Sequence, residues 1–334
     1  KIKNKKIEIE NIKSKISIKS LIKDKFSVKN LDISTKSLKI KNLISFLRNY
    51  ENKPELYILE KVFQKGFLVT TIKLEFDEQG KIKENYKLSG LIKDAEINTF
   101  QKYNLKKLNL LFDFENQNLV IKDISFNLID IPIFSEKISI KKRGKDKLFV
   151  KGSLENKDII IEGDVLRGVI NNFKSNFKIK NINLNSKNNF SFYLIDKFRV
   201  DDLKLNSKIE LKSVKLLNNF ELKNFFPQIK NEIEFLNHSI NINFDDKNLN
   251  IKGNGKINLQ KKNDKINYEI EKNKDKFDFK IISEIEDNPL SINFLNYKKK
   301  VDSKAKLEIS GSYFSNKNIV IKLLTYDQSK NNFK

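Results

Sequence analysis

Residues 108–128 read LNLLFDFENQNLVIKDISFNL, and this stretch contains two runs in which apolar and polar residues alternate. Successive side chains of a β-strand point to opposite faces, so every second residue shares a face. One face is then apolar, and its members are Leu108, Leu110, Phe112, Phe114, Ile124, Phe126 and Leu128. Between the runs, Glu115–Asn118 is polar and typical of a hairpin turn. The stretch predicts an antiparallel hairpin with one apolar face and one wet face.

The same alternation returns in the second half of the chain. Its apolar members there are Ile240, Ile242, Phe244, Phe277, Phe279 and Ile281. Further polar turns separate apolar runs at Asp77–Gly80, Asp245–Asn248 and Ser315–Asn318. Strands joined by short turns pair with their neighbours in sequence, so we expect a mainly β fold built as an elongated antiparallel β-meander.

Five glycines close a similar phrase of apolar, any, apolar and polar residues. They are Gly90, Gly152, Gly163, Gly253 and Gly311. Glycine within a strand often marks a bulge or a bend, which predicts strands that curve at similar points into an open groove. The alternative is that these glycines only end strands.

Two segments have helical spacing instead, so a few short helices are expected. The first contains apolar residues at i, i+3 and i+4, namely Ile40, Leu43, Ile44 and Leu47. Ser37 is available as its cap, while Pro54 opens a second short helix that Gly66 can end.

The second helical segment contains Leu222, Phe225, Phe226 and Ile229, with Pro227 inside it. Both segments precede strands, which indicates a weak internal duplication. We therefore predict one elongated, repeat-built β domain over residues 1–334, with units at 31–165 and 205–334. Because the chain begins at Lys1 without Met, we expect it to be processed or part of a larger protein.

The charge and the Arg content limit which partners are expected. The formal net charge is +23, yet Lys supplies nearly all of it, and the four arginines are Arg48, Arg143, Arg167 and Arg199. Arg is the residue suited to bidentate recognition of phosphates and bases, and the Lys residues are spread along the whole chain. Nucleic acid is therefore not the expected partner.

Residues that carry chemistry are scarce, so no catalytic residue, metal site or cofactor is expected. The chain has no Cys, and its only histidine, His238, precedes a predicted strand, where we expect a partly exposed loop position rather than a catalytic base. Two basic runs, at residues 141–145 and 298–300, are expected at solvated hairpin tips. Contact with the phosphates of lipid or nucleic acid is their alternative role.

The order of features resembles the AsmA-like family of bacterial envelope proteins, in particular its YhdP-type and TamB-type branches. The similarity is best over residues 31–165. It includes the helix around Leu43–Leu47, the segment 58–66, the strand 72–76, the segment 88–95 and the meander 108–128. Residues 216–311 look like a looser second copy.

The resemblance implies a non-enzymatic, bridge-like lipid carrier in the bacterial periplasm, anchored to the inner membrane through the parent protein. Phospholipid acyl chains would lie in an apolar groove between inner and outer membranes. The groove candidates are Leu108, Leu110, Phe112, Phe114, Ile124, Phe126, Leu128, Ile240, Ile242, Phe244, Phe277, Phe279 and Ile281. The candidates for lipid headgroups are Lys141, Lys142, Arg143 and Lys145.

Two other functions stay open on the sequence. A structural or adhesive β-repeat protein has the same alternation, but its apolar faces close into a dry core. A basic nucleic-acid-binding protein is the second alternative. It requires Arg and aromatic residues gathered on one surface.

Overall fold

The fold was analysed in a computed structural model. It describes residues 8–23, 25–50, 54–98, 104–144, 147–169, 178–195, 199–218, 223–273, 276–293, 296–301, 303–314, 319–328 and 331–333. The protein is mainly β, and its principal sheet is an antiparallel meander that is not closed, accompanied by a few short helices. The predicted fold class is confirmed at this level.

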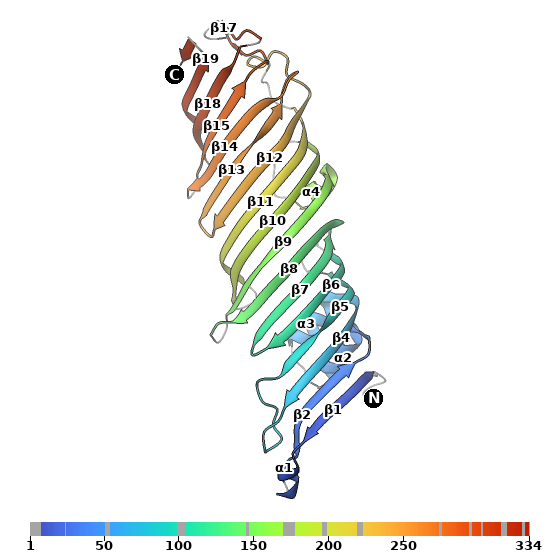
Figure 1. The fold of residues 1–334 in the computed structure, drawn as a ribbon. Helices are drawn as coiled ribbons and strands as arrows, with labels where there is room; N and C mark the ends of the chain where they lie inside the picture. The colour runs from blue at the N-terminus through green and yellow to red at the C-terminus, as the bar shows by residue number, and fades with distance from the viewer. Residues whose placement is uncertain are drawn as a thin grey trace. The chain divides into compact units, whose positions relative to one another are not determined.

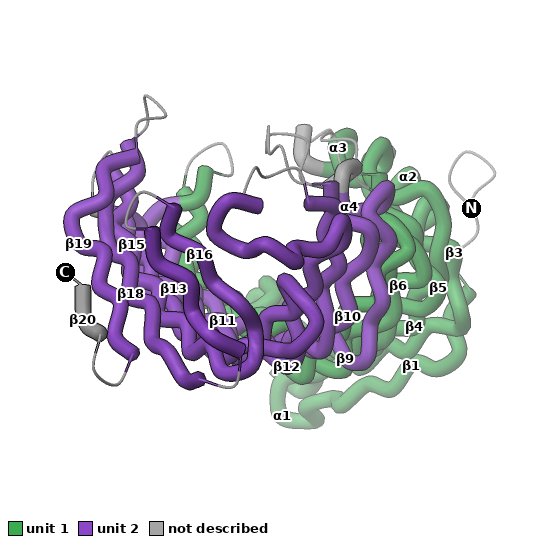
Figure 2. The backbone as a smooth tube through the Cα atoms, turned by 90° about the horizontal axis from the view of Figure 1, so that it is seen from above, with its two compact units in different colours: residues 1–154, 192–200 green, residues 155–191, 201–334 purple. Residues whose placement is uncertain are grey.

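The chain divides into two compact units (Figure 2). Unit 1 contains residues 1–154 and 192–200, and unit 2 contains residues 155–191 and 201–334. The boundaries fall inside three long strands: β9 (Leu148–Glu162), β10 (Lys178–Ile195) and β11 (Arg199–Leu217).

Strands of unit 1 follow one another in sequence order, as the blue to green part of Figure 1 shows. They are β1 (Ile9–Ile16), β2 (Val28–Thr35), β3 (Leu38–Lys39), β4 (Phe63–Glu75), β5 (Lys87–Asn98), β6 (Asn104–Glu115), β7 (Asn118–Leu128) and β8 (Ile131–Lys142). Antiparallel pairs run from β1 to β2, from β2 to β4, and then stepwise to β8, while β3 pairs with β4.

Three helices interrupt the strands of unit 1: α1 (Ile18–Ile22), α2 (Ile40–Tyr50) and α3 (Pro54–Val62). The predictions of α2 and α3 are confirmed. Their capping was predicted wrongly, because β3 separates Ser37 from α2 and Gly66 lies within β4 at φ +129°. Ile40 and Ile44 of α2 pack with Ala95, Leu108 and Ile124 in the buried core of this unit.

Unit 2 contains α4 (Gly163–Val169) and a second run of neighbouring strands. These are β12 (Glu232–Asp245), β13 (Asn248–Asn258), β14 (Asp264–Asn273), β15 (Lys276–Ile285), β18 (Ala305–Phe314), β19 (Ile319–Gln328) and β20 (Asn331–Phe333). The pairs run stepwise from β11 to β15, then to β18, β19 and β20. Figure 2 shows these strands following a curve rather than a plane.

The small hairpin of β16 (Ser291–Ile292) and β17 (Tyr297–Lys298) connects β15 to β18. Residues 223–230, where the sequence predicted part of a helix around Pro227, form turns instead, so that prediction is wrong for the described residues. Leu222 lies outside them. The i, i+3, i+4 spacing fails here because the proline removes a helical donor and restricts the residue before it.

Bulges without glycine occur on three strands of unit 1. Asp94, Lys107 and Asp123, on three consecutive strands, adopt φ near +50°, and the strand register shifts beside them. The amide of Asp94 donates to Oδ1 of Asn109 at 3.0 Å, so a neighbouring strand satisfies the bulged backbone. Each bulge inserts one residue and increases the local twist.

The five predicted glycines do not share one role. The register shifts beside Gly311, as predicted for a bulge, and Gly163 follows the end of β9, as in the alternative, whereas Gly90 and Gly253 face aromatic rings. Gly90 is the cross-strand partner of Phe112, and a Cβ on Gly90 would lie 3.0 Å from the tip of that ring. Gly253 is likewise opposite Tyr268, whose ring occupies the place of a Cβ. Glycine at these positions leaves room for the aromatic ring of the adjacent strand, as in aromatic rescue of sheet glycines.

We expect Gly90→Ala to lower the free energy of unfolding by about 1–3 kcal/mol, the usual cost of overpacking. The added Cβ would overlap the carbonyl oxygen of Val69 and crowd Phe112, and the backbone cannot move away without breaking the sheet. The midpoint of urea unfolding measures the effect. Ser89→Ala, one residue earlier on the same strand, is the control, and equal midpoints for the two variants would contradict this account.

Candidate functional site

An unbroken row of apolar side chains crosses seven strands of unit 1. Each member is the direct cross-strand partner of the next: Ile12, Ile33, Ile72, Leu88, Phe114, Leu119 and Ile140. We call this set the unit 1 apolar row. Six inter-strand steps of roughly 4.8 Å make it about 29 Å long.

The next position along each strand belongs to the opposite face and is polar. These partners also form a row across the same strands: Lys13, Asp32, Lys73, Lys87, Glu115, Asn118 and Lys141. Ion pairs link this face across strands, for example Lys87 with Glu115 at 2.5 Å. A shift of one residue anywhere would exchange the two faces, so the alternation and the register together define an amphipathic sheet.

Within the described residues of unit 1, the buried cluster of the apolar face lies toward one end of the strands. Ile40 and Ile44 of α2 cover the level of Ala95, Leu108 and Ile124, which are all buried. Seven residues earlier along β5, Leu88 belongs to the apolar row and is only half-buried. The members of this row are half-buried, apart from the exposed Ile12.

The sequence-predicted residues of unit 1 all share this face, but they do not have the same surroundings. Leu108 and Ile124 are buried, and Leu110 and Phe126 pack against the same cluster beneath α2. Leu128 pairs with Leu105 at the far end of the strands. Phe112 and Phe114 lie toward the opposite end, where Phe114 belongs to the apolar row.

Unit 2 repeats the arrangement. Its apolar row has seven cross-strand partners: Ile209, Ile240, Gly253, Tyr268, Ile281, Ile309 and Leu324. The predicted residues Ile242 and Phe279 belong to the next row on this face, and Phe244 and Phe277 to the row after that. All six predicted residues of this unit are thus brought together on one face.

The opposite face of unit 2 is polar at the neighbouring level. Its residues from β11 to β18 are Lys208, Asn241, Lys252, Glu269, Lys280 and Ser310. Nearby, Asp278 accepts a hydrogen bond from Ser312 and pairs with Lys276 and Lys322, and these contacts hold the pKa of its carboxyl well below the usual range.

The prediction from the sequence included Ile124 but missed Leu119 and Ile121 on the same apolar face. Simple alternation cannot place all three residues on one side. The bulge at Asp123 shifts the parity by one residue and restores the apolar face. A run of two polar residues, Lys122 and Asp123, between apolar sets was the available signal.

The predicted headgroup residues lie at one hairpin end. Lys141 and Lys142 close β8, and the amide of Arg143 donates to the carbonyl of Lys147 at 2.8 Å. All three side chains are exposed, while Lys145 lies outside the described residues. The run therefore forms a solvated hairpin end, as predicted for its fold.

His238 differs from its prediction, because it lies inside β12 and is only 2% exposed. Its Nε2 is 2.9 Å from the carbonyl oxygen of Lys256, and its Nδ1 is 3.3 Å from the hydroxyl of Tyr268. A carbonyl can only accept, so Nε2 carries the hydrogen and Nδ1 accepts from Tyr268. Burial lowers the pKa of His238 and raises that of Tyr268 to about 12.

This histidine predicts a loss of stability in mild acid. Its folded pKa lies below the unfolded value of 6.5, so the unfolded chain binds a proton first as the pH falls. The free energy of unfolding should therefore fall below pH 6.5, at most by about 1.4 kcal/mol per pH unit from this group. His238→Gln should reduce the change between pH 7.5 and 5.0, measured by urea unfolding, and an unchanged pH dependence would exclude this role.

The connection between β15 and β18 contains a buried lysine. Lys299 belongs to a basic run predicted to be solvated, yet it is 3% exposed. Its ammonium donates to the carbonyls of Glu286 at 2.8 Å, Asn288 at 3.0 Å and Lys300 at 3.2 Å. The connection packs on the sheet through a buried cluster that includes Leu290 and Tyr326.

We expect Lys299→Ala to destabilise this connection by about 1–3 kcal/mol, because three buried carbonyls lose their donor. Faster cleavage near Tyr297 by chymotrypsin is the readout, since this protease cuts at neither lysine nor alanine. Lys298→Ala, at the exposed neighbouring position, is the control and should be cleaved at the wild-type rate. Equal rates for both variants would contradict the role of Lys299.

No family model, curated protein or solved structure matches this chain. Among the described residues, no helix is long and apolar enough to cross a membrane. No group of three or more His, Cys, Asp or Glu side chains suited to a metal ion occurs in the part of the chain that the structure describes.

Proposed function

We propose that this protein is a non-enzymatic lipid-binding protein that holds acyl chains against the apolar face of its sheet and serves lipid transfer. The observation that carries the proposal is the unit 1 apolar row, which is continuous over seven strands and has a charged row directly behind it. Its side chains are half-buried rather than enclosed.

The dimensions of this row suit an acyl chain. The hydrocarbon core of a bilayer is about 30 Å thick and is shared by two leaflets, so one extended acyl chain spans roughly 15 Å. The row, about 29 Å long, can therefore lie along a whole chain. Its members offer no polar group to the ligand, so affinity would depend on chain length rather than on headgroup chemistry.

The energetics favour reversible holding. Full burial of a methylene stabilises by about 0.8 kcal/mol, and a chain covered on one side gains roughly half of that. Such a chain is retained in water but exchanges with a membrane, which is the property that a carrier requires. Phospholipid as cargo and a bacterial envelope as location are parts of the proposal that rest on the AsmA-like resemblance.

The alternatives make different use of the same face. A structural β-repeat protein encloses its apolar residues, and burial on this face is concentrated under α2 and at the β15–β18 connection. A nucleic-acid-binding protein presents Arg and stacked aromatic residues on a charged surface. The polar rows of both units contain Lys, Asp, Glu, Asn and Ser instead.

Mass spectrometry of solvent extracts tests the proposal directly. The protein is purified without detergent and washed at high salt, which removes lipid held only by charge. We expect retained phospholipid in a stoichiometric amount. Folded protein that carries no lipid would favour the structural β-repeat protein.

Two substitutions at adjacent positions of β7 separate binding from folding. Leu119→Asp places a charge in the apolar row, away from the cluster beneath α2, and should reduce retained lipid at least about tenfold, given the cost of burying a charge beside an acyl chain. Val120→Asp makes the same change on the opposite face, opposite Asp113 and Ser139, and should retain lipid as the wild type does. Equal lipid loss in both variants would point to a general defect.

A further inference from the structure

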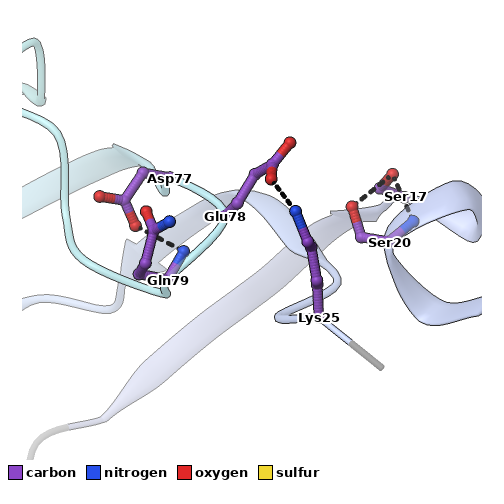
Figure 3. Close-up of polar contacts among 6 residues, drawn as sticks. All are labelled: Ser17, Ser20, Lys25, Asp77, Glu78 and Gln79. Carbon is purple, nitrogen blue, oxygen red and sulfur yellow. Dashed lines mark hydrogen bonds and ion pairs between the residues drawn. The ribbon is translucent and has the colours of Figure 1, made fainter. Parts of the chain in front are cut away.

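The short helix α1 connects β1 to β2 and lies beyond the ends of both strands (Figure 1). Ser17 caps it, since its hydroxyl accepts from the amide of Ser20 at 3.3 Å and from the hydroxyl of Ser20 at 3.0 Å (Figure 3). The turn after β4 lies next to it, because Lys25 pairs with Glu78 of that turn. We call residues 16–23, 25–29 and 75–83 together the α1 tip.

The helix buries none of its residues. Ile18 is 72% exposed, Leu21 60% and Ile22 78%, and Ile16 and Ile82 of the same tip are also more than half exposed. Single exposed apolar residues are ordinary, but a group on one protruding element indicates an interaction surface.

The tip is anchored beneath these side chains. The ring of Phe26 lies 5.5 Å from that of Phe76 and packs over Gly80, where a Cβ would approach it to 3.1 Å. Asp77 fixes the turn, because its Oδ1 accepts from the amides of Gln79 at 3.0 Å and Lys81 at 2.9 Å. The exposed isoleucines and leucine therefore project from an ordered support.

The α1 tip also carries lysines. A surface depression of about 840 Å³ in the tip is lined by five lysines and three carboxylates, namely Lys19, Lys23, Lys25, Lys29, Lys83, Glu75, Asp77 and Glu78. Lys25, with weaker contributions from Lys23 and Lys19, lowers the pKa of Glu78, so these ammonium groups act on one region. Lys25 and Lys83 have acidic partners here, whereas Lys19, Lys23 and Lys29 have no ion pair with a described carboxylate.

We propose that the α1 tip docks on the surface of an anionic lipid membrane. Ile18, Leu21 and Ile22 enter the boundary between headgroups and acyl chains, and Lys19, Lys23 and Lys29 of the same tip meet lipid phosphates. Exposed aliphatic residues beside lysines without a described ion pair match this interface, where apolar burial and attraction to anionic lipid act together. Nucleic acid would engage the lysines but leave the aliphatic side chains in water.

This inference rests on the proposed function and adds the route by which lipid reaches the sheet. The two strands that leave α1 carry the first two members of the unit 1 apolar row, Ile12 on β1 and Ile33 on β2. Ile18 follows Ile12 by six positions, a distance of about 20 Å along an extended chain. Docking at α1 thus brings a membrane to the start of the row.

Flotation with vesicles tests the docking. Wild-type protein should float with phosphatidylcholine vesicles that contain phosphatidylglycerol and much less with pure phosphatidylcholine vesicles. The triple variant Ile18→Ser, Leu21→Ser, Ile22→Ser should weaken binding at least about tenfold, since three side chains no longer enter the interface. The matched control replaces three exposed aliphatic residues outside the tip, Ile160, Val200 and Val301, by Ser and should bind as the wild type does.

A second variant, Lys19→Gln with Lys23→Gln, tests the charge and should bind less and lose part of its dependence on salt. Full vesicle binding by the triple variant, or equal binding to both kinds of vesicle, would overturn the proposal. If Lys19→Gln with Lys23→Gln lost binding to single-stranded DNA but bound vesicles as the wild type does, the proposal would also be overturned.

The two proposals fail separately. The triple variant, when loaded with phospholipid from detergent micelles, should hold as much lipid as the wild type, because the apolar row is unchanged, while Leu119→Asp should still float with vesicles. Loss of lipid from Leu119→Asp without loss of flotation supports both assignments. Vesicle binding by a wild-type protein that carries no lipid would leave docking intact and remove the acyl-chain function.

Discussion

Backbone pairing between antiparallel neighbours is the constraint on which the rest of this structure depends. Each hydrogen-bonded pair fixes which side chains are opposite, and the fixed register joins strand-level alternation into rows that cross the sheet. Ile72, Leu88 and Phe114 become neighbours because β4, β5 and β6 pair in this register, although they are far apart in sequence. The amphipathic character is a property of the sheet and is lost by a slip of one residue.

Bulges allow that register to persist along long strands. At Asp94, Lys107 and Asp123 the chain inserts a residue in a left-handed conformation, and the apolar face continues on the far side of each insertion. Asp and Asn tolerate this conformation better than most residues with a Cβ. The abundance of Asp and Asn thus has a structural use: they form turns, occupy bulges and, as with Asn109, accept from the bulged amide.

The apolar side chains of the sheet fall into two groups, those that are buried and those that stay partly exposed. Under α2 and at the β15–β18 connection, apolar residues are buried, and the buried ammonium of Lys299 donates to three carbonyls. Elsewhere on the apolar face, side chains cover one another only in part. A face that is half dry stabilises the sheet and still gains free energy when an acyl chain covers it. The exposed residues of α1 extend this logic to a membrane surface.

The sequence by itself determined the β-meander, the helices α2 and α3, and the membership of Phe112 or Ile242 in an apolar face, because these follow from local period and turn chemistry. It did not predict that Leu119 and Ile124 share a face, that His238 and Lys299 are buried, or that the residues around Pro227 form no helix. Those outcomes depend on cross-strand register, on bulges and on the packing of distant segments. Only the tertiary structure decided which part of the apolar face is covered and which is open, since helix and connection reach the sheet through contacts that no local pattern encodes.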